Sequence, residues 1–215
     1  GGTGELIISN GGTVTGDYST IGSVAGSTGT VTVDGAGAVM NTAGITVGNA
    51  GEGTLNITNG GEVNSSSAVV IGIDSTGDGT VTVNGTNSVL NANGSPTASW
   101  GSLYVGSAFG YPNGTGTLTI ADGGVVNSAR FGMIGYSANS NGAVNVSSNG
   151  QLNLVNASGV AQGLTIGNSG TGTLNINTAG NVTAGSVGIG SQSTGVGTAN
   201  IDGIDALLNL SLIHI

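Results

Sequence analysis

The sequence predicts an all-β protein that winds as a right-handed parallel β-helix of about eight coils, each with roughly 25 residues and three short strands. Three features predict it: a strand-like phrase recurs at near-constant spacing, glycine turns follow at fixed offsets, and 45 of the 215 residues are glycine. We expect one repeat domain over residues 1–209, as a fragment of a longer chain, with an insertion near 94–114. Residues 210–215 are expected to form a tail outside the repeat.

The first strand of each coil begins with a glycine, followed usually by a threonine, an aliphatic residue, a polar residue and a second aliphatic residue. Thr80–Val83 shows the period-two alternation that is typical of a half-buried strand. One coil cannot bury its apolar face alone, so stacked coils are expected to share a core. The eight phrases begin at Gly4, Gly29, Gly53, Gly79, Gly116, Gly142, Gly172 and Gly197.

The corner after the first strand is an Asn-Gly or Asp-Gly pair in every coil except the one with Ala179-Gly180. Such pairs adopt the positive φ angles that tight corners require. Because Asp and Asn alternate at this place, we interpret Asp34, Asp122 and Asp202 as turn residues rather than as functional charges. The pairs begin at Asn10, Asp34, Asn59, Asn84, Asp122, Asn149 and Asp202.

The third strand of each coil ends in an aliphatic residue and a glycine. Along the sequence, more residues separate successive first-strand phrases from Gly79 to Gly116, and again from Gly142 to Gly172, than elsewhere in the chain. The aliphatic-glycine pairs are Ile21-Gly22, Val47-Gly48, Ile71-Gly72, Val105-Gly106, Ile134-Gly135, Ile166-Gly167 and Ile189-Gly190.

The composition excludes several classes of function. The only base is Arg130 and the formal net charge is −9, which argues against a phosphate-binding loop, a Schiff base or a nucleic-acid partner. The chain has no cysteine and a single histidine, His214, so we expect no disulfide, no metal site, no cofactor and no catalytic triad. No apolar run is long enough to span a membrane in this segment.

The repeat resembles the passenger-associated repeat of bacterial autotransporters, and the related repeat of type V secretion and PEP-CTERM-type exported proteins. The residues that carry the resemblance are Gly29–Val39, Ile45–Gly48 and Gly53–Gly61. The resemblance implies a secreted, non-catalytic structural or adhesive segment on the surface of a Gram-negative cell. It also implies an outer-membrane β-barrel elsewhere in the full chain. A surface glycan, a matrix protein or a cell-surface protein would be the partner.

The insertion is the candidate ligand site, because functional residues of repeat proteins often lie on loops that leave the coil. Its aromatic side chains are able to form a patch that binds sugar or protein. In the alternative interpretation, Trp100 and Phe109 pack the loop onto the coil while Leu103 and Val105 continue a strand. The candidate ligand-binding residues are Trp100, Tyr104, Phe109 and Tyr111.

Two other functions remain open. A carbohydrate-active enzyme on this fold would use paired carboxylates, for which Asp74 with Asp78, or Asp202 with Asp205, are the candidates. An ice-binding protein would use a flat ladder of outward threonines, which Thr30 and Thr32 begin if Val31 and Val33 point inward. Asn residues in the ladder, together with Glu5 and Ala143, interrupt it, and stacked Thr and Asn also stabilise sheets directly.

Overall fold

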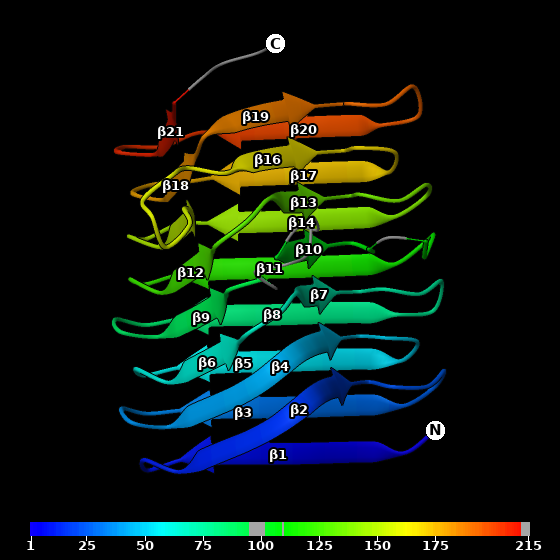
Figure 1. The fold of residues 1–215 in the computed structure, drawn as a ribbon, viewed down its shortest axis with the longest axis vertical. Helices are drawn as coiled ribbons and strands as arrows, with labels where there is room; N and C mark the ends of the chain where they lie inside the picture. The colour runs from blue at the N-terminus through cyan, green and yellow to red at the C-terminus, as the bar shows by residue number, and fades with distance from the viewer. Residues whose placement is uncertain (95–101, 109, 212–215) are drawn as a thin grey trace.

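The computed structural model describes residues 1–94, 102–108 and 110–211, and it confirms an all-β solenoid of about eight turns (Figure 1). Trp100, Phe109 and His214 lie outside the described residues. The strands of the ladders pair in parallel throughout this part of the chain. Among the described residues no helix has the length and hydropathy needed to span a membrane.

The first strand of each coil belongs to one eight-stranded sheet. Each strand pairs with the next in register, so that Gly29, Gly53 and Gly79 lie opposite one another in successive coils. The predicted first strands are therefore all confirmed. They are β1 (Thr3–Ser9), β3 (Thr28–Asp34), β5 (Glu52–Thr58), β8 (Asp78–Asn84), β11 (Thr115–Ala121), β14 (Asn141–Val146), β17 (Thr171–Ile176) and β20 (Val196–Ile201).

The second and third strands of the coils form the other sheet. Its long strands, β2 (Thr13–Ile21) and β4 (Val39–Val47), each span both positions. The remaining strands are β6 (Glu62–Ser65), β7 (Val69–Ile71), β9 (Val89–Ala92), β10 (Leu103–Val105), β12 (Val125–Ser128), β13 (Gly132–Ile134), β15 (Gln151–Leu154), β16 (Gly163–Ile166), β18 (Asn181–Ala184), β19 (Ser186–Ile189) and β21 (Leu207–Leu210).

The prediction of three strands in every coil was wrong for the first two coils, where the second and third strands are continuous. Between Thr42 and Ile45 the bend of β4 contains only Ala43 and Gly44, and β2 follows it in register. The next coil has residues 66–68 at this bend, where the backbone leaves the ladder and β6 separates from β7. The bend in this coil is one residue longer, but bend length alone does not decide continuity, since β18 and β19 are separate strands across a bend as short as that of β4.

The coil is right-handed (Figure 1). As the chain climbs from the N-terminus, the strands of the first sheet run to the left behind, and β2 and β4 cross to the right in front of them. The core lies between the two sheets and runs the length of the rod. In the middle coils Leu118, Ile120 and Val126 are completely buried.

Five of the predicted corners are displaced by one residue. Asp34, Asn84 and Asp202 lie one position earlier than Asn59, level with Thr58, and in these pairs only the glycine has a positive φ. Asn10, Asn59 and Asp122 have φ values of 53°, 52° and 53°, as an Asn-Gly corner requires. In the sixth coil, however, Val146 pairs with Ile120, and the corner residues with positive φ are Ser148 and Asn149 rather than Asn149 and Gly150.

The seventh coil has the same displaced corner as the sixth coil. This displacement explains why Ala179-Gly180 departs from the Asn-Gly pattern. Ala179 occupies the place of Asn149 with a φ of 57°, and Gly180 occupies the place of Gly150. A Cβ at Gly180 would lie 2.3 Å from the carbonyl oxygen of Val146 in the preceding coil. The glycine after the corner is therefore required by packing between coils.

Candidate functional site

The coils depart from regularity at the bend between the second and third strands. In three coils with a short bend, an inward hydroxyl of Thr42, Ser65 or Ser128 satisfies a carbonyl of the bend. Thr42 donates to the Gly44 oxygen at 2.9 Å, and Ser128 donates to the Arg130 oxygen at 3.0 Å. Ala92 and Leu154 occupy the corresponding position in two other coils, and there more residues separate the second strand from the third, which begins at Leu103 and at Gly163. Two insertions therefore emerge at the same bend, two coils apart.

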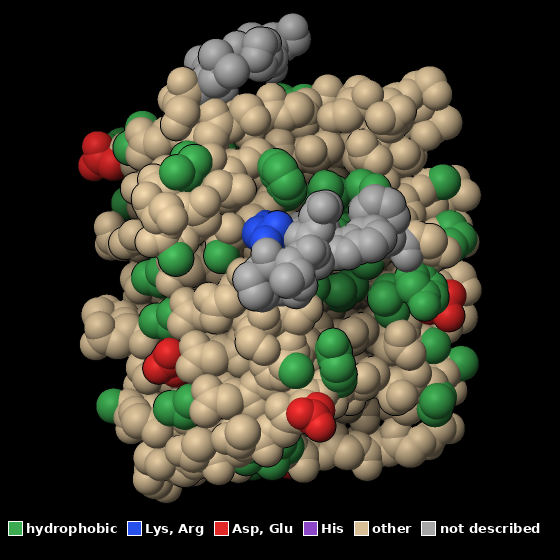
Figure 2. Space-filling model, in the orientation of Figure 1, with side chains coloured by type: hydrophobic (Ala, Val, Ile, Leu, Met, Phe, Trp, Pro, Cys, Tyr) green, Lys and Arg blue, Asp and Glu red, His purple; other side chains and the backbone are tan. Residues whose placement is uncertain are grey.

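A cleft of about 340 Å³ lies between these insertions and includes Arg130. Arg130 is the blue side chain in Figure 2, since the chain has no other Lys or Arg. The described residues that line the cleft include no acidic side chain. Its polar lining side chains are those of Asn93, Arg130, Asn156, Ser158 and Gln162.

Contacts with residues of the underlying coil hold Arg130 in place. Its backbone N–H donates to Ser102 Oγ at 3.0 Å, and Ser102 Oγ lies 2.5 Å from Ser128 Oγ in a buried hydrogen bond. Its side-chain methylenes pack over Gly94, where a Cβ would come within 2.9 Å of Arg130 Cδ. The floor of the cleft is therefore built on the core of the rod.

One wall of the cleft is held by hydrogen bonds within residues 155–162. Asn156 Oδ1 accepts from the backbone N–H groups of Ser158 at 3.0 Å and Val160 at 2.9 Å. Gln162 Nε2 donates to the Val160 oxygen at 2.9 Å. Amides, a hydroxyl and one guanidinium group are able to bind a ligand that carries hydroxyls and a carboxylate.

The four predicted aromatic residues do not form one described patch. Tyr104 lies on β10, at an outward-facing position level with Val70 and Met133. It is nevertheless only 3% exposed, and the ring of Tyr136 packs edge-on against it with 5.9 Å between centroids. Tyr111 is 51% exposed, whereas Trp100 and Phe109 lie outside the described residues.

Sequence reasoning missed Tyr136, the 155–162 insertion and the location of Arg130. Burial raises the pKa of the Tyr136 hydroxyl, in keeping with its place beside Tyr104. The sequence did contain a signal for the cleft. In both of the longer repeats, the extra residues lie between the second and third strand phrases. Aligning those phrases would have placed the two insertions on the same edge of the rod.

The outward threonines of the first sheet lie in the predicted columns, with Thr30, Thr54 and Thr80 in adjacent register. The neighbouring column changes to asparagine in the later coils. There Asn175 Nδ2 donates to Asn145 Oδ1 and Asn200 Nδ2 to Asn175 Oδ1, each at 2.8 Å. These amides bond to one another along the rod, which supports a stabilising role.

A longer amide ladder runs along the second sheet. Each Nδ2 group donates to the Oδ1 of the preceding coil at 2.8–3.2 Å. Stacked amides of this kind stiffen the solenoid because each one links two coils. The members of the ladder are Asn41, Asn64, Asn91, Asn127 and Asn153.

Six of the ten acidic residues lie within strands and four lie in the connections between them. Asp34 accepts hydrogen bonds from Thr58 Oγ1 and Asn59 Nδ2, both at 2.7 Å, and these lower the pKa of its carboxyl group. Glu52 and Asp78 are exposed register partners on β5 and β8, a proximity that the sequence did not single out. The described residues contain no group of three or more His, Asp or Glu that could hold a metal ion.

The comparisons with known proteins give one relative and no family. No family model matches the chain, and no solved structure matches it. The uncharacterized lipoprotein YdeK of Escherichia coli (strain K12) is 40% identical to this chain over 104 residues. The aligned segment is 47% of this chain and spans only 8% of that protein.

Proposed function

We propose that this chain is a structural and adhesive segment of an autotransporter-like passenger on the surface of a bacterial cell. A β-solenoid fits a structural surface segment, and the lipoprotein relative supports a location in the cell envelope. The amide ladders and the continuous core make the rod stiff, as a segment that projects from a surface requires. The extracellular location and the autotransporter route rest on the repeat pattern.

The observation that carries the adhesive part is the cleft between the two bend insertions, which contains the only base of the chain. Binding residues are commonly placed on loops that a rigid scaffold positions. Arg130 is suited to a carboxylate because its guanidinium is able to donate two parallel hydrogen bonds. We therefore propose a surface glycan with acidic sugars as the ligand.

Adhesion is tested with microspheres that carry the purified chain, on plates coated with polygalacturonate or with neutral dextran. The parent chain is expected to adhere to polygalacturonate. Arg130→Gln should weaken this binding by about tenfold, the factor that corresponds to 1.4 kcal/mol. Arg130→Lys should restore it only in part, since lysine lacks the planar fork. Trp100→Ala and Tyr111→Ala test the aromatic residues of the insertion.

The matched control is Thr82→Ala, which alters the outer face of the first sheet, away from the cleft. This variant should bind like the parent chain. Equal adhesion of the parent chain and Arg130→Gln would remove the cleft from the proposal. Equal retention on dextran and polygalacturonate would remove the acidic glycan.

Surface location is tested with the full-length protein, tagged within this segment and expressed in intact Gram-negative cells. External protease should remove the tag from whole cells. A tag that is cleaved only after lysis would contradict the surface location.

A further inference from the structure

Two clefts lie next to each other on the side of the rod, where the second strand of each coil bends into the third. One is the cleft of about 340 Å³ that contains Arg130. The other, which we call the amide cleft, has a volume of about 330 Å³. Asn93 lines both clefts, so they adjoin. The polar side chains of the amide cleft include those of Thr15, Asn41, Asn64, Ser66 and Asn93.

The hydrogen bonds of the bend show that the two clefts follow one line. The backbone N–H groups of Ser66, Asn93 and Ala129 each donate to a carbonyl oxygen of the preceding coil at 3.0 Å. These bonds stack the bend residues one per coil, and each of these residues lines one of the two clefts or both. Together the clefts therefore form a groove parallel to the rod axis, which we call the side groove. The stacked bend residues are Ala43, Ser66, Asn93 and Ala129.

The amides of the amide cleft are held in place and retain hydrogen-bonding capacity. Asn64 Nδ2 donates to Asn41 Oδ1 at 3.1 Å, and Asn64 Oδ1 accepts from Asn91 Nδ2 at 2.8 Å. Because a carboxamide has two N–H donors and an oxygen that accepts twice, these contacts leave one donor and one acceptor on Asn64. Sugar hydroxyls donate and accept in the same way. Successive amides repeat at the strand spacing of about 4.8 Å, which is close to the length of one sugar unit.

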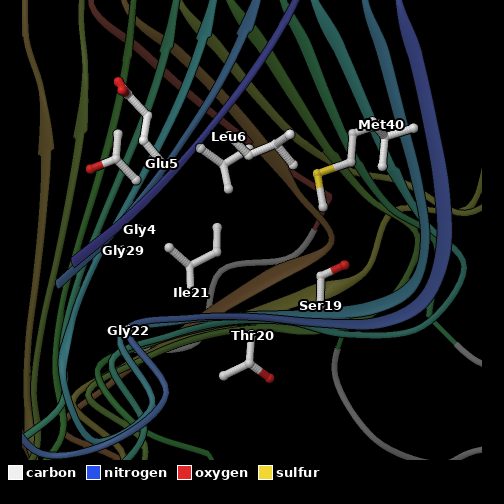
Figure 3. Close-up of a pocket in the computed structure, with 12 residues that line it drawn as sticks. Gly4, Glu5, Leu6, Ser19, Thr20, Ile21, Gly22, Gly29 and Met40 are labelled. Atoms are coloured by element: carbon white, nitrogen blue, oxygen red, sulfur yellow. The ribbon is translucent and has the colours of Figure 1, made fainter. Parts of the chain in front are cut away.

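The side groove is independent of how the rod ends. A cavity of about 410 Å³ opens at the first coil, where Leu6, Ile21 and Met40 point into the space (Figure 3). These side chains continue the apolar columns of the core, as the pairing of Leu6 with Val31 shows, so this cavity is part of the core. The side groove lies on the flank of the rod instead, and coils stacked at either end would lengthen it without covering it.

We propose that the side groove binds a run of several sugars of a linear acidic polysaccharide, which lies parallel to the rod. This inference rests on the acidic glycan proposed above as the ligand of Arg130. Arg130 is the one charged side chain among the described residues that line the two clefts, so it receives a carboxylate. The amide of Asn64, two coils or about 10 Å away, receives hydroxyls of sugars further along the same polysaccharide.

The experiment compares the affinities of the purified chain for digalacturonate and hexagalacturonate by isothermal titration calorimetry. The parent chain should bind the hexasaccharide more than tenfold more tightly, because only the longer ligand reaches from Arg130 to Asn64. Equal affinities for the two oligosaccharides would overturn the proposal.

Ser66→Glu tests the amide cleft, because Ser66 is an exposed residue of its lining. The added carboxylate should weaken binding of the hexasaccharide about tenfold. Binding of the disaccharide should not change at about 0.15 M salt, where the Debye length of about 8 Å is shorter than the distance to Arg130. Ser66→Gln, which is of the same size without the charge, should have a smaller effect.

The matched control is Thr82→Glu, which adds the same charge on the outer face of the first sheet and should bind both oligosaccharides like the parent chain. Equal hexasaccharide affinities for Ser66→Glu and Thr82→Glu would overturn the side groove. Arg130→Gln distinguishes this failure from failure of the proposed function, since it should weaken binding of both oligosaccharides. Loss of binding in Arg130→Gln without any effect of Ser66→Glu would refute the side groove alone. No effect of either variant would refute both proposals.

Discussion

Gly79→Ala is expected to be among the most destabilising single-methyl additions in the chain. A Cβ at Gly79 would lie 2.1 Å from the Val47 oxygen and 2.5 Å from the Gly72 nitrogen, whereas real Cβ contacts essentially never fall below 3.0 Å. These two backbone atoms share a 2.8 Å hydrogen bond, so the methyl group would enter that bond.

The magnitude follows from the two effects. Overpacking typically costs about 1–3 kcal/mol, and the loss of one backbone hydrogen bond adds about 1 kcal/mol. Relief of the contact requires the coils to separate by about 1 Å, and neither atom belongs to a flexible side chain. We therefore expect Gly79→Ala to lower the free energy of unfolding by about 2–4 kcal/mol.

The matched control is Gly4→Ala, which changes the same position of the same phrase in the first coil. Its Cβ meets nothing within 4 Å, so its effect should stay within about 0.5 kcal/mol. The assay is urea-induced unfolding, followed by circular dichroism. Equal midpoints for the two variants would refute the conclusion that contact between coils, rather than backbone conformation, requires glycine here.

Three further predictions concern the core, the ladder and pH. Leu118→Ala should lower the free energy of unfolding by about 3–5 kcal/mol, because Leu118 is fully buried, and a shift below about 1 kcal/mol in the same assay would contradict the shared core. Asn91→Ala removes the hydrogen bonds to Asn64 and from Asn127, and should cost about 1–2 kcal/mol, whereas no measurable change would show that the ladder adds nothing. The pKa of Asp34 is lowered below its ordinary value of 3.8 in the folded chain, so its stabilising contribution is present above the unfolded pKa and is lost as the pH falls through the folded pKa. Asp34→Asn should therefore flatten the decline of the thermal midpoint below about pH 4, and an unchanged pH profile would refute this role.

Much of the site could not be predicted because it depends on how the coils align. Trp100, Tyr104, Phe109 and Tyr111 were grouped because they are close in sequence. In the structure Tyr104 instead continues a strand and packs against Tyr136, which belongs to the next coil. The ice-binding and enzymatic alternatives remain predictions, which thermal hysteresis and polysaccharide cleavage assays would test.

The local pattern was enough to establish the solenoid, its approximate number of coils and the register of the first sheet. Period-two alternation and glycine at fixed offsets specify which side chains face inward, wherever the coil lies in the stack. Contacts between coils decided the rest. The alignment of Val146 with Ile120 moved the sixth corner to Ser148 and Asn149, and β2 and β4 run on through the bend that divides the strands of later coils. Stacking also brought Asn93 and Gly94 close to residues 156–162 around Arg130, because residues distant in the chain become neighbours only when coils pack.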